Sequence, residues 1–267
     1  MTMRRSGWIS RVMMAALMIY LLLPLAATGL YAVAGEWTDT LLPKQWTLEW
    51  FRQVFSDMAL WEALWTSFSL CAVSVALSLA VMLPAVFVIT VYFPRAEVFM
   101  KSVVVLPYAV PGVVAAVGLI RTYSSGPLAI SGTAYLLIGA YFIVILPFMY
   151  QGIRNSLLTV SAPELLNAAE LLGAKPWTAF RTVIFPNIWP GVLVSTLLSF
   201  SVLFGEFVLT NLLVGGHIQT VQIYLYRRMG ENGHSASAIA ISYFILILLL
   251  SIGLMKLGKR GSGGIHS

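Results

Sequence analysis

Six apolar runs, each long enough to cross a lipid bilayer, constrain this chain more than any other feature of its sequence. They lie at about residues 12–33, 64–91, 102–120, 133–149, 190–214 and 237–255. A membrane-spanning helix needs roughly 20 predominantly apolar residues. The chain is 59% hydrophobic and only 10% charged, whereas a soluble domain carries about 25% charged residues. The bilayer is therefore expected to be the solvent of this chain.

Each run is expected to be an α-helix, because hydrocarbon offers an open backbone no hydrogen-bond partner. The sequence predicts an all-α, polytopic membrane protein with six transmembrane helices in a single domain, residues 1–267. The first run follows three arginines and ends in YAVAG, which mimics a signal peptide and its cleavage site. Its apolar core is too long for that, so we expect it to remain as a span.

The distribution of basic residues predicts the orientation of the spans. Six spans place both termini on one side. If the N-terminus is cytoplasmic, the cytoplasmic segments hold Arg4, Arg5, Arg11, Arg95, Lys101, Arg154, Lys175, Arg181, Lys256, Lys259 and Arg260. The outer segments then hold only Lys44, Arg52, Arg121, Arg227 and Arg228. Because Lys and Arg concentrate in cytoplasmic loops, both termini are predicted to be cytoplasmic. In the first outer loop, TLEWFRQVF and several tryptophans predict an interfacial helix.

A helix-forming loop at about residues 157–188 separates the fourth and fifth runs, on the predicted cytoplasmic side. Ser161 and Glu164 have the spacing of a capping box. Gly173 suits a left-handed stop at the end of the helix. Pro176 can open a second short helix, and Pro186 is expected to end it. The loop is thus predicted to be a helix, a sharp turn and a second helix.

The charge of this loop indicates what it contacts. Its first helix carries Glu164 and Glu170 but no basic residue, so an anionic membrane surface would repel it. Ala168 and Ala169 are small, so a partner can approach the helix closely there. A protein partner is therefore favoured over lipid headgroups.

The stretch NAAELLGAKPWTAFRTVIFP resembles the signature loop of binding-protein-dependent ABC importer permeases. In that pattern Glu-Ala-Ala is followed by three residues, Gly, nine residues, Ile, one residue and Leu-Pro. Ala168, Ala169, Gly173 and Pro186 match it, while Asn167, Val183 and Phe185 replace the Glu, Ile and Leu. The resemblance extends over most of the chain, including LPYAVPGVVAAVGLI in the third run.

The resemblance implies that the loop is a coupling helix that docks on a separate ATP-hydrolysing subunit. Residues assigned to this contact are Glu164, Asn167, Ala168, Ala169, Gly173 and Pro186. It further implies a dimer of those ATP-binding subunits holding ATP and Mg²⁺, a second permease subunit, an external solute-binding protein and a bacterial-type inner membrane. The chain has no G-x-x-x-x-G-K-[ST] motif, so no ATP site, cofactor or enzymatic activity is expected in it.

Candidates for the solute path lie within the runs. Glu206 is the only acid inside a span, and a charge at the bilayer centre costs about 2.5–3.5 kcal/mol unless it faces protein or water. It is predicted to line the path, with a structural hydrogen bond as the alternative. Pro107, Tyr108, Pro111 and Gly112 are predicted to form a gate, because prolines break the helical hydrogen-bond ladder. Static kinks are the alternative.

Other classes of protein remain open at this point. An ion-coupled secondary transporter would usually show inverted repeats, and none is convincing here. A non-transporting membrane assembly protein would not need Glu206 or the prolines. Nucleic-acid binding is not indicated, since no basic cluster is interleaved with aromatics, and the three histidines have no metal-ligand spacing. The segments SSGPLAISGT and LPKQWTLEWF resemble the branch that carries polyamines, 2-aminoethylphosphonate, ferric iron or thiamine, with an aminophosphonate or polyamine favoured.

The predicted topology can be tested with accessible tags. A tag after Ser267 and a tag beside Lys175 should be reached only from the cytoplasm, and a tag near Asp39 only from outside. Protease protection in sealed cells and in inverted vesicles measures both. Labelling of the Asp39 and Lys175 positions from the same side would contradict the six-span topology.

Overall fold

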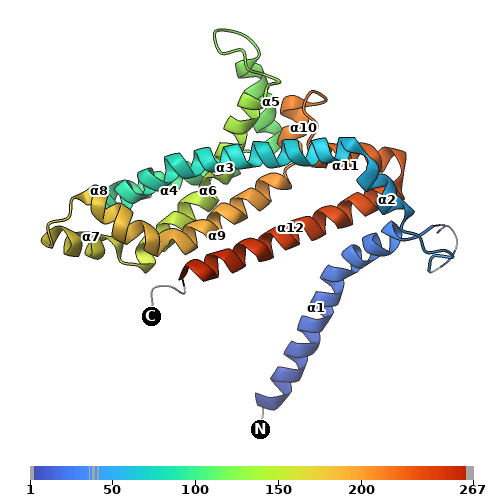
Figure 1. Ribbon diagram of the computed structural model, residues 1–267, viewed down its shortest axis with the longest axis horizontal. Helices are drawn as coiled ribbons and strands as arrows, with labels where there is room; N and C mark the ends of the chain where they lie inside the picture. Colours follow the sequence, from blue (N-terminus) through green and yellow to red (C-terminus); the bar gives the residue numbers. More distant parts are fainter. Residues whose placement is uncertain (1–2, 36, 38–39, 41, 263–267) are drawn as a thin grey trace. The chain divides into compact units, whose positions relative to one another are not determined.

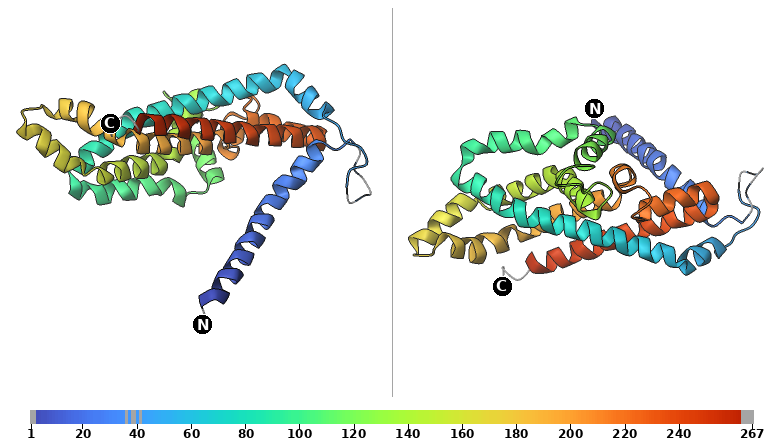
Figure 2. Two further views of the ribbon diagram at one scale, coloured as in Figure 1. Left: turned by 60° about the horizontal axis from the view of Figure 1, so that its bottom comes forward. Right: turned by 90° about the horizontal axis from the view of Figure 1, so that it is seen from above.

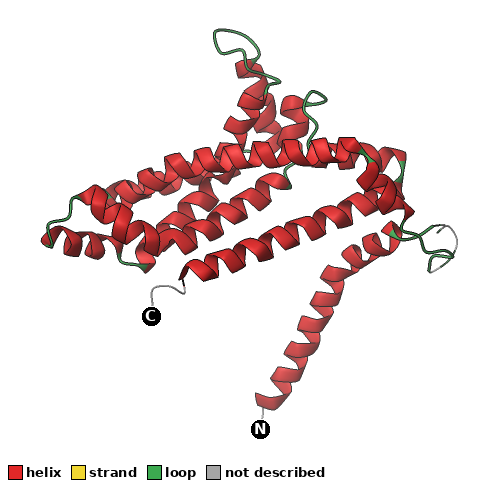
Figure 3. Ribbon diagram, in the orientation of Figure 1, coloured by secondary structure: helices red, strands yellow, loops and turns green. Residues whose placement is uncertain are grey.

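The computed structural model describes residues 3–35, 37, 40 and 42–262. Within that part the secondary structure is helical (Figure 3), with no strand and one isolated bridge between Ala34 and Trp46. The predicted all-α fold is therefore confirmed. Asp39 and Ser267, which carry the proposed tags, lie outside the described residues.

Fourteen helical segments follow one another along the described residues of the chain (Figure 1). The longest are α1 (Met3–Ala32), α3 (Met58–Tyr92), α6 (Ala134–Thr159), α9 (Phe185–Phe204) and α12 (Gly233–Ser262). The shorter ones are α2 (Glu49–Ser56), η1 (Pro94–Ala96), α4 (Glu97–Ala109), α5 (Gly112–Tyr123), α7 (Ala162–Leu171), α8 (Pro176–Ala179), the π-helical η2 (Phe180–Ile184), α10 (Val208–Val214) and α11 (Val221–Glu231). Segment α2 is a helix at the place predicted for the interfacial helix.

Two of the six predicted spans are not single helices. Five helices in the described part are long and apolar enough to cross a membrane, or six if a bent pair counts as one span. That pair is α4 and α5, which meet at 96° inside the third predicted span. Val110 is extended there, with φ −102° and ψ 120°, because a residue before proline is driven out of the helical region. The fifth span is interrupted between Phe204 and Val208, where α9 ends and α10 begins.

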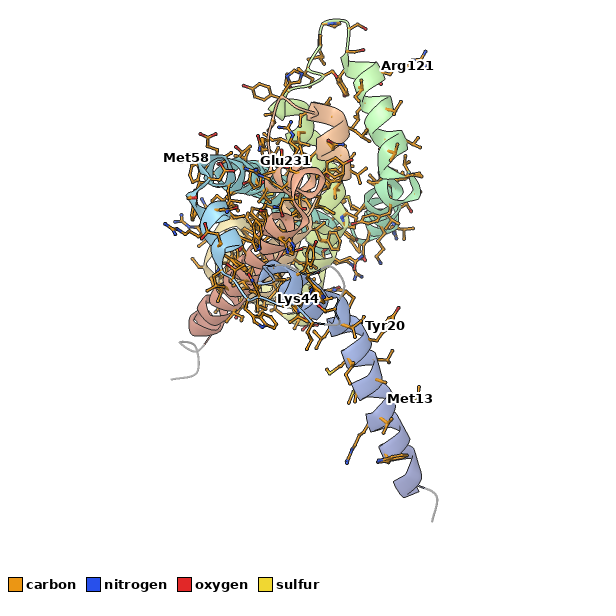
Figure 4. The ribbon with its side chains drawn as sticks, turned by 90° about the vertical axis from the view of Figure 1, so that its right-hand side faces the viewer. Met13, Tyr20, Lys44, Met58, Arg121 and Glu231 are labelled. Atoms are coloured by element: carbon orange, nitrogen blue, oxygen red, sulfur yellow. The ribbon has the colours of Figure 1, made fainter. Side chains whose placement is uncertain are left out.

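The chain packs as two compact units, residues 1–62 with 224–248 and residues 63–223 with 249–267. The single transmembrane domain stays a prediction. In the first unit α1 is long and exposed. Its side chains, such as Met13 at 61% and Tyr20 at 74% exposure, point outward (Figure 4). The most apolar stretch of α1 has no buried residue, so this helix is suited to contact lipid or a second chain.

A polar cluster joins the start of α3 to α11 in the first unit. One oxygen of Asp57 accepts from the backbone N–H of Ala59 at 3.0 Å, which caps α3. The other oxygen accepts from the Tyr224 hydroxyl at 2.6 Å and pairs with Arg228. The Tyr224 hydrogen bond, with the Ala59 and Arg228 contacts, lowers the pKa of the Asp57 carboxyl despite its burial. The cluster therefore favours the ionised carboxylate and ties two distant segments of the chain together.

The second unit is organised around the contact between α6 and α9, which lie side by side (Figure 2). A Cβ added to Gly152 of α6 would lie 2.1 Å from the Cβ of Ser195, and one added to Gly191 of α9 would lie 2.1 Å from the Oγ of Ser156. Each serine hydroxyl bonds a carbonyl of its own helix, Ser195 to Val192 at 2.9 Å and Ser156 to Gly152 at 2.7 Å. Two reciprocal glycine–serine contacts thus let the helix backbones approach, as small residues do in membrane helix pairs.

The glycine–serine contacts predict that substitutions of two glycines in the same helix change the free energy of unfolding differently. Gly152→Ala should lower the free energy of unfolding by about 1–3 kcal/mol, because the added methyl group overpacks against Ser195. Gly139→Ala, where nothing lies within 4 Å of the new Cβ, should be neutral or stabilise by up to about 1 kcal/mol through better helix propensity. Denaturant titration of both variants in detergent micelles measures the difference. Equal stability of the two would contradict the close approach of α6 and α9.

Candidate functional site

The predicted coupling loop forms α7, a tight turn and α8. The backbone N–H of Gly173 donates to the Glu170 carbonyl at 2.9 Å, and that of Ala174 to the Ala169 carbonyl at 3.0 Å. Gly173 has φ +84°, a left-handed backbone that glycine adopts freely and most other residues adopt only with strain. These two bonds form a Schellman motif. The left-handed stop predicted at Gly173 and the helix opening at Pro176 are both confirmed.

The predicted capping box at the start of α7 is wrong. Ser161 has φ +49° and makes no side-chain hydrogen bond to the first turn. The N–H of Glu164 donates instead to the Ser161 backbone carbonyl at 2.9 Å. A capping serine needs an extended backbone to aim its hydroxyl at the first-turn N–H groups. The left-handed conformation of Ser161 removes that geometry.

The two alanines of the loop face opposite ways. Ala168 is exposed, whereas Ala169 is buried within the chain at 9% exposure. Ala168 is therefore accessible to a partner and Ala169 is not, while a partner contact at Ala168 stays a prediction. Among the remaining residues assigned to the ATPase contact, Glu164, Asn167, Gly173 and Pro186 are exposed.

Large apolar side chains at the tip of the loop were missed by the sequence reasoning. Leu171 and Leu172 are each 89% exposed, and Trp177 is 69% exposed. Exposed apolar clusters of this kind mark interaction surfaces. The available signal was the Leu-Leu pair directly before the turn glycine, which a charge-based argument ignores. We refer to Leu171, Leu172 and Trp177 as the apolar tip.

Pro186 does not end the second helix, contrary to the prediction. Segments α8, η2 and α9 run on as one helical stretch, Pro176–Phe204. The π-turn η2 lies directly before the proline, and the N–H of Phe185 donates to the Phe180 carbonyl five residues earlier. A π-bulge shifts the hydrogen-bond register of a helix. The shift accommodates Pro186, so the loop is joined to the fifth span without a break.

Glu206 fills the gap between α9 and α10. Its carboxylate accepts from the backbone N–H groups of Leu209 at 2.8 Å and Thr210 at 3.0 Å, and from the Thr210 hydroxyl at 2.9 Å. The Tyr141 hydroxyl of α6 lies 2.5 Å from that same Thr210 oxygen. Glu206 therefore caps α10 and is linked through Thr210 to α6. Arg121, a basic residue of the predicted outer segments, lies in the last turn of α5 (Figure 4).

The predicted gate residues lie at and around the break between α4 and α5. Pro107 and Gly112 line a cavity of about 370 Å³ together with Val110, Ile143 and Leu209. Tyr108 bonds the Val144 carbonyl of α6 at 3.3 Å, and Pro111 is the first residue before α5. The cavity lining is apolar, so it can be closed by side-chain packing without leaving a polar group unpaired.

Glu206 and the cavity at Pro107 are connected through Leu209 of α10. Leu209 donates its N–H to Glu206, and its side chain lines the cavity. The structure thus brings the broken third span, the break in the fifth span and Glu206 together within the second unit. A role of Glu206 in the solute path, and of the proline segment as a gate, stays a prediction.

Several helices that can span a membrane, with breaks inside two of the predicted spans and a helical loop between the fourth and fifth, define a polytopic helical membrane protein. Residues 81–260 match the family described as binding-protein-dependent transport system inner membrane component. The chain belongs to this family and is a permease component of a binding-protein-dependent ABC importer. It is a multi-pass membrane protein, and in this family the ATPase is a separate subunit. The two alternatives left open by the sequence, an ion-coupled secondary transporter and a non-transporting assembly protein, do not fit this family.

Individual relatives agree with the family. The chain is 28% identical over 246 residues to the putative 2-aminoethylphosphonate transport system permease protein PhnV of Salmonella typhimurium, covering 91% of both chains. Its fold resembles a bacterial alginate ABC transporter solved with a periplasmic protein, with a TM-score of 0.75 at 16% identity over 96% of each chain. It also resembles the MetNI methionine ABC transporter, with a TM-score of 0.63 at 18% identity over 76% of this chain and 95% of that one.

The capping role of Glu206 predicts a loss of stability on its removal. Glu206→Ala leaves three donors of α10 without their acceptor, and hydrogen bonds between membrane helices are worth on average about 0.6 kcal/mol and at most about 1.7 kcal/mol each. The free energy of unfolding in micelles should therefore fall by about 1–3 kcal/mol. Glu170→Ala, at an exposed position of α7, is the matched control and should change little. A Glu206→Ala protein as stable as wild type would contradict the capping role.

Proposed function

We propose that this chain forms, with a second permease subunit, the channel of an importer that carries 2-aminoethylphosphonate or a chemically similar aminophosphonate into a bacterial-type cell. The substrate assignment rests on one observation, the similarity to the PhnV permease over nine-tenths of both chains. A polyamine is the second candidate, because Glu206 could attract a cationic solute. Both solutes carry an ammonium group, so Glu206 does not by itself discriminate between them.

In this proposal an external binding protein delivers the solute on one side, and a dimer of ATP-binding subunits acts on the other. ATP and Mg²⁺ are held by those subunits, and this chain holds no cofactor. The contact surface is α7 with the apolar tip. The exposed leucines favour burial in a groove of the ATPase, since apolar area removed from water stabilises an interface by about 25 cal/mol per Å².

The continuous helix from the loop into the fifth span supplies the route by which the ATPase contact is coupled to the membrane part. From Pro176 the helix runs through the π-turn into the fifth span and ends at Phe204. Movement of the tip is therefore transmitted along a rigid helix to Glu206 and the cavity at the broken third span. ATP binding can shift the equilibrium of the permease only if the ATPase contact differs in free energy between its two states.

The substrate is tested by uptake into proteoliposomes that hold the complete importer and its binding protein. Uptake of labelled 2-aminoethylphosphonate should require ATP, and an excess of unlabelled 2-aminoethylphosphonate should compete while spermidine should not. Competition by spermidine alone would transfer the assignment to polyamines. Uptake that persists without ATP would contradict the importer mechanism.

The coupling role of the loop is tested at its turn glycine. Gly173→Val places a β-branched residue at φ +84°, which is strained for every such side chain. ATP-driven uptake should fall at least about tenfold, while membrane levels stay normal. Gly173→Asn is the matched control, because asparagine tolerates the left-handed region and should retain most uptake. Equal uptake by the valine and asparagine variants would remove the coupling role from this turn.

A further inference from the structure

A second cavity lies between α4 and α6, apart from the one at the helix break. Its volume is about 340 Å³, and its polar lining is Lys101, Tyr150, Gln151, Arg154 and Asn155. None of these residues lines the cavity at Pro107. All lie toward the ends of α4 and α6 nearest to the coupling loop, since α6 ends at Thr159 and α7 begins at Ala162.

A buried hydroxyl at this cavity has no acceptor for its proton within the described part of the chain. The Tyr150 side chain is 3% exposed, and its hydroxyl lies beside the Arg154 guanidinium, which can donate to the hydroxyl oxygen but cannot accept its proton. Burying a hydroxyl without a hydrogen bond is unfavourable, and buried polar atoms in proteins are nearly always paired. A hydroxyl proton without an acceptor, at a cavity that Tyr150 and Arg154 both line, therefore points to a ligand with acceptor atoms.

The charges around the cavity indicate the sign of that ligand. Lys101 lies 2.7 Å from an oxygen of Glu97, and the Arg154 Nε donates to that same oxygen. Two cations share one carboxylate, so the group keeps one net positive charge. An arginine carries five N–H donors and a lysine three, so donors beyond those used by Glu97 remain. The amide groups of Gln151 and Asn155 add further donors.

Donors from a guanidinium, an ammonium, two amides and a hydroxyl match an anion with several acceptor oxygens. Arginine in particular pairs with phosphate through parallel N–H bonds. A cation would meet two basic side chains and a single acid whose oxygen is already shared. We propose that the cavity between α4 and α6 binds a phosphate-class oxyanion through Lys101, Arg154 and the Tyr150 hydroxyl.

Two sources supply this chemistry. One is a free oxyanion, either inorganic phosphate or a phosphonate. The other is the head group of an anionic lipid, because basic pockets between membrane helices hold such head groups. The site does not depend on the identity of the transported solute, so its test is independent of the uptake experiments.

The test uses the full chain, purified in detergent, and measures thermal unfolding against rising inorganic phosphate or methylphosphonate at constant ionic strength. A ligand that binds only the folded state raises the unfolding temperature with concentration. Tyr150→Phe removes only the hydroxyl, whose proton has no acceptor in the chain, so the variant should fold with nearly unchanged stability without anion. Its apparent affinity for the anion should be at least about tenfold weaker, because a hydrogen bond to a charged group is lost.

A pair of charge variants gives the matched control. Arg154→Gln should abolish the anion-dependent shift, whereas Arg95→Gln, an exposed cation near the start of α4 that does not line the cavity, should keep it. The lipid source is measured by native mass spectrometry of the chain from nanodiscs that contain phosphatidylglycerol. Bound phosphatidylglycerol that is lost in Tyr150→Phe, with no response to free phosphate, assigns the site to a head group.

Either source supports the site. The proposal is overturned if wild type responds to neither free oxyanions nor phosphatidylglycerol, or if Tyr150→Phe and Arg154→Gln respond as wild type does.

Discussion

The hydrocarbon interior of the bilayer leaves backbone N–H and C=O groups no partner outside the chain, and this constraint governs each part of the molecule. Long helices satisfy it directly. Helix breaks satisfy it only where another group takes over the freed hydrogen bonds. Each break in a helix therefore marks a place where another group must bond the freed backbone N–H and C=O groups.

The break in the fifth span shows how this requirement is met. Glu206 accepts from the first N–H groups of α10, so a charged side chain replaces the carbonyls that a continuous helix would have supplied. The same carboxylate is linked through Thr210 to Tyr141, which is 2% exposed on α6. Glu206 therefore replaces backbone carbonyls at the break and is bonded to Leu209, which lines the cavity, so a movement of α10 would change these hydrogen bonds.

The second unit combines a closely packed helix pair, α6 and α9, with a bent pair, α4 and α5. The close contact of α6 and α9 through Gly152 and Gly191 leaves no room for sliding without a clash. Both helices flank the coupling loop, one ending before α7 and the other continuing from α8 through the π-turn. The apolar tip is therefore connected directly to this closely packed helix pair. The bent α4–α5 pair packs beside it, with α4 against α6 and α5 against α10.

Local rules determined much of this protein from sequence alone. Apolar run length predicted the helices and the membrane as solvent, and Gly173 predicted the left-handed turn, because both depend on residues close together in the chain. Only the tertiary structure decided that Ala169 is buried, that Pro186 follows a π-turn, and that Glu97 meets Arg154 across 57 residues. In a membrane helix, lipid-facing and protein-facing sides are both apolar, so periodicity cannot tell them apart. The partners of Glu206 and the surroundings of the Tyr150 hydroxyl are set by packing between helices, which no local pattern encodes.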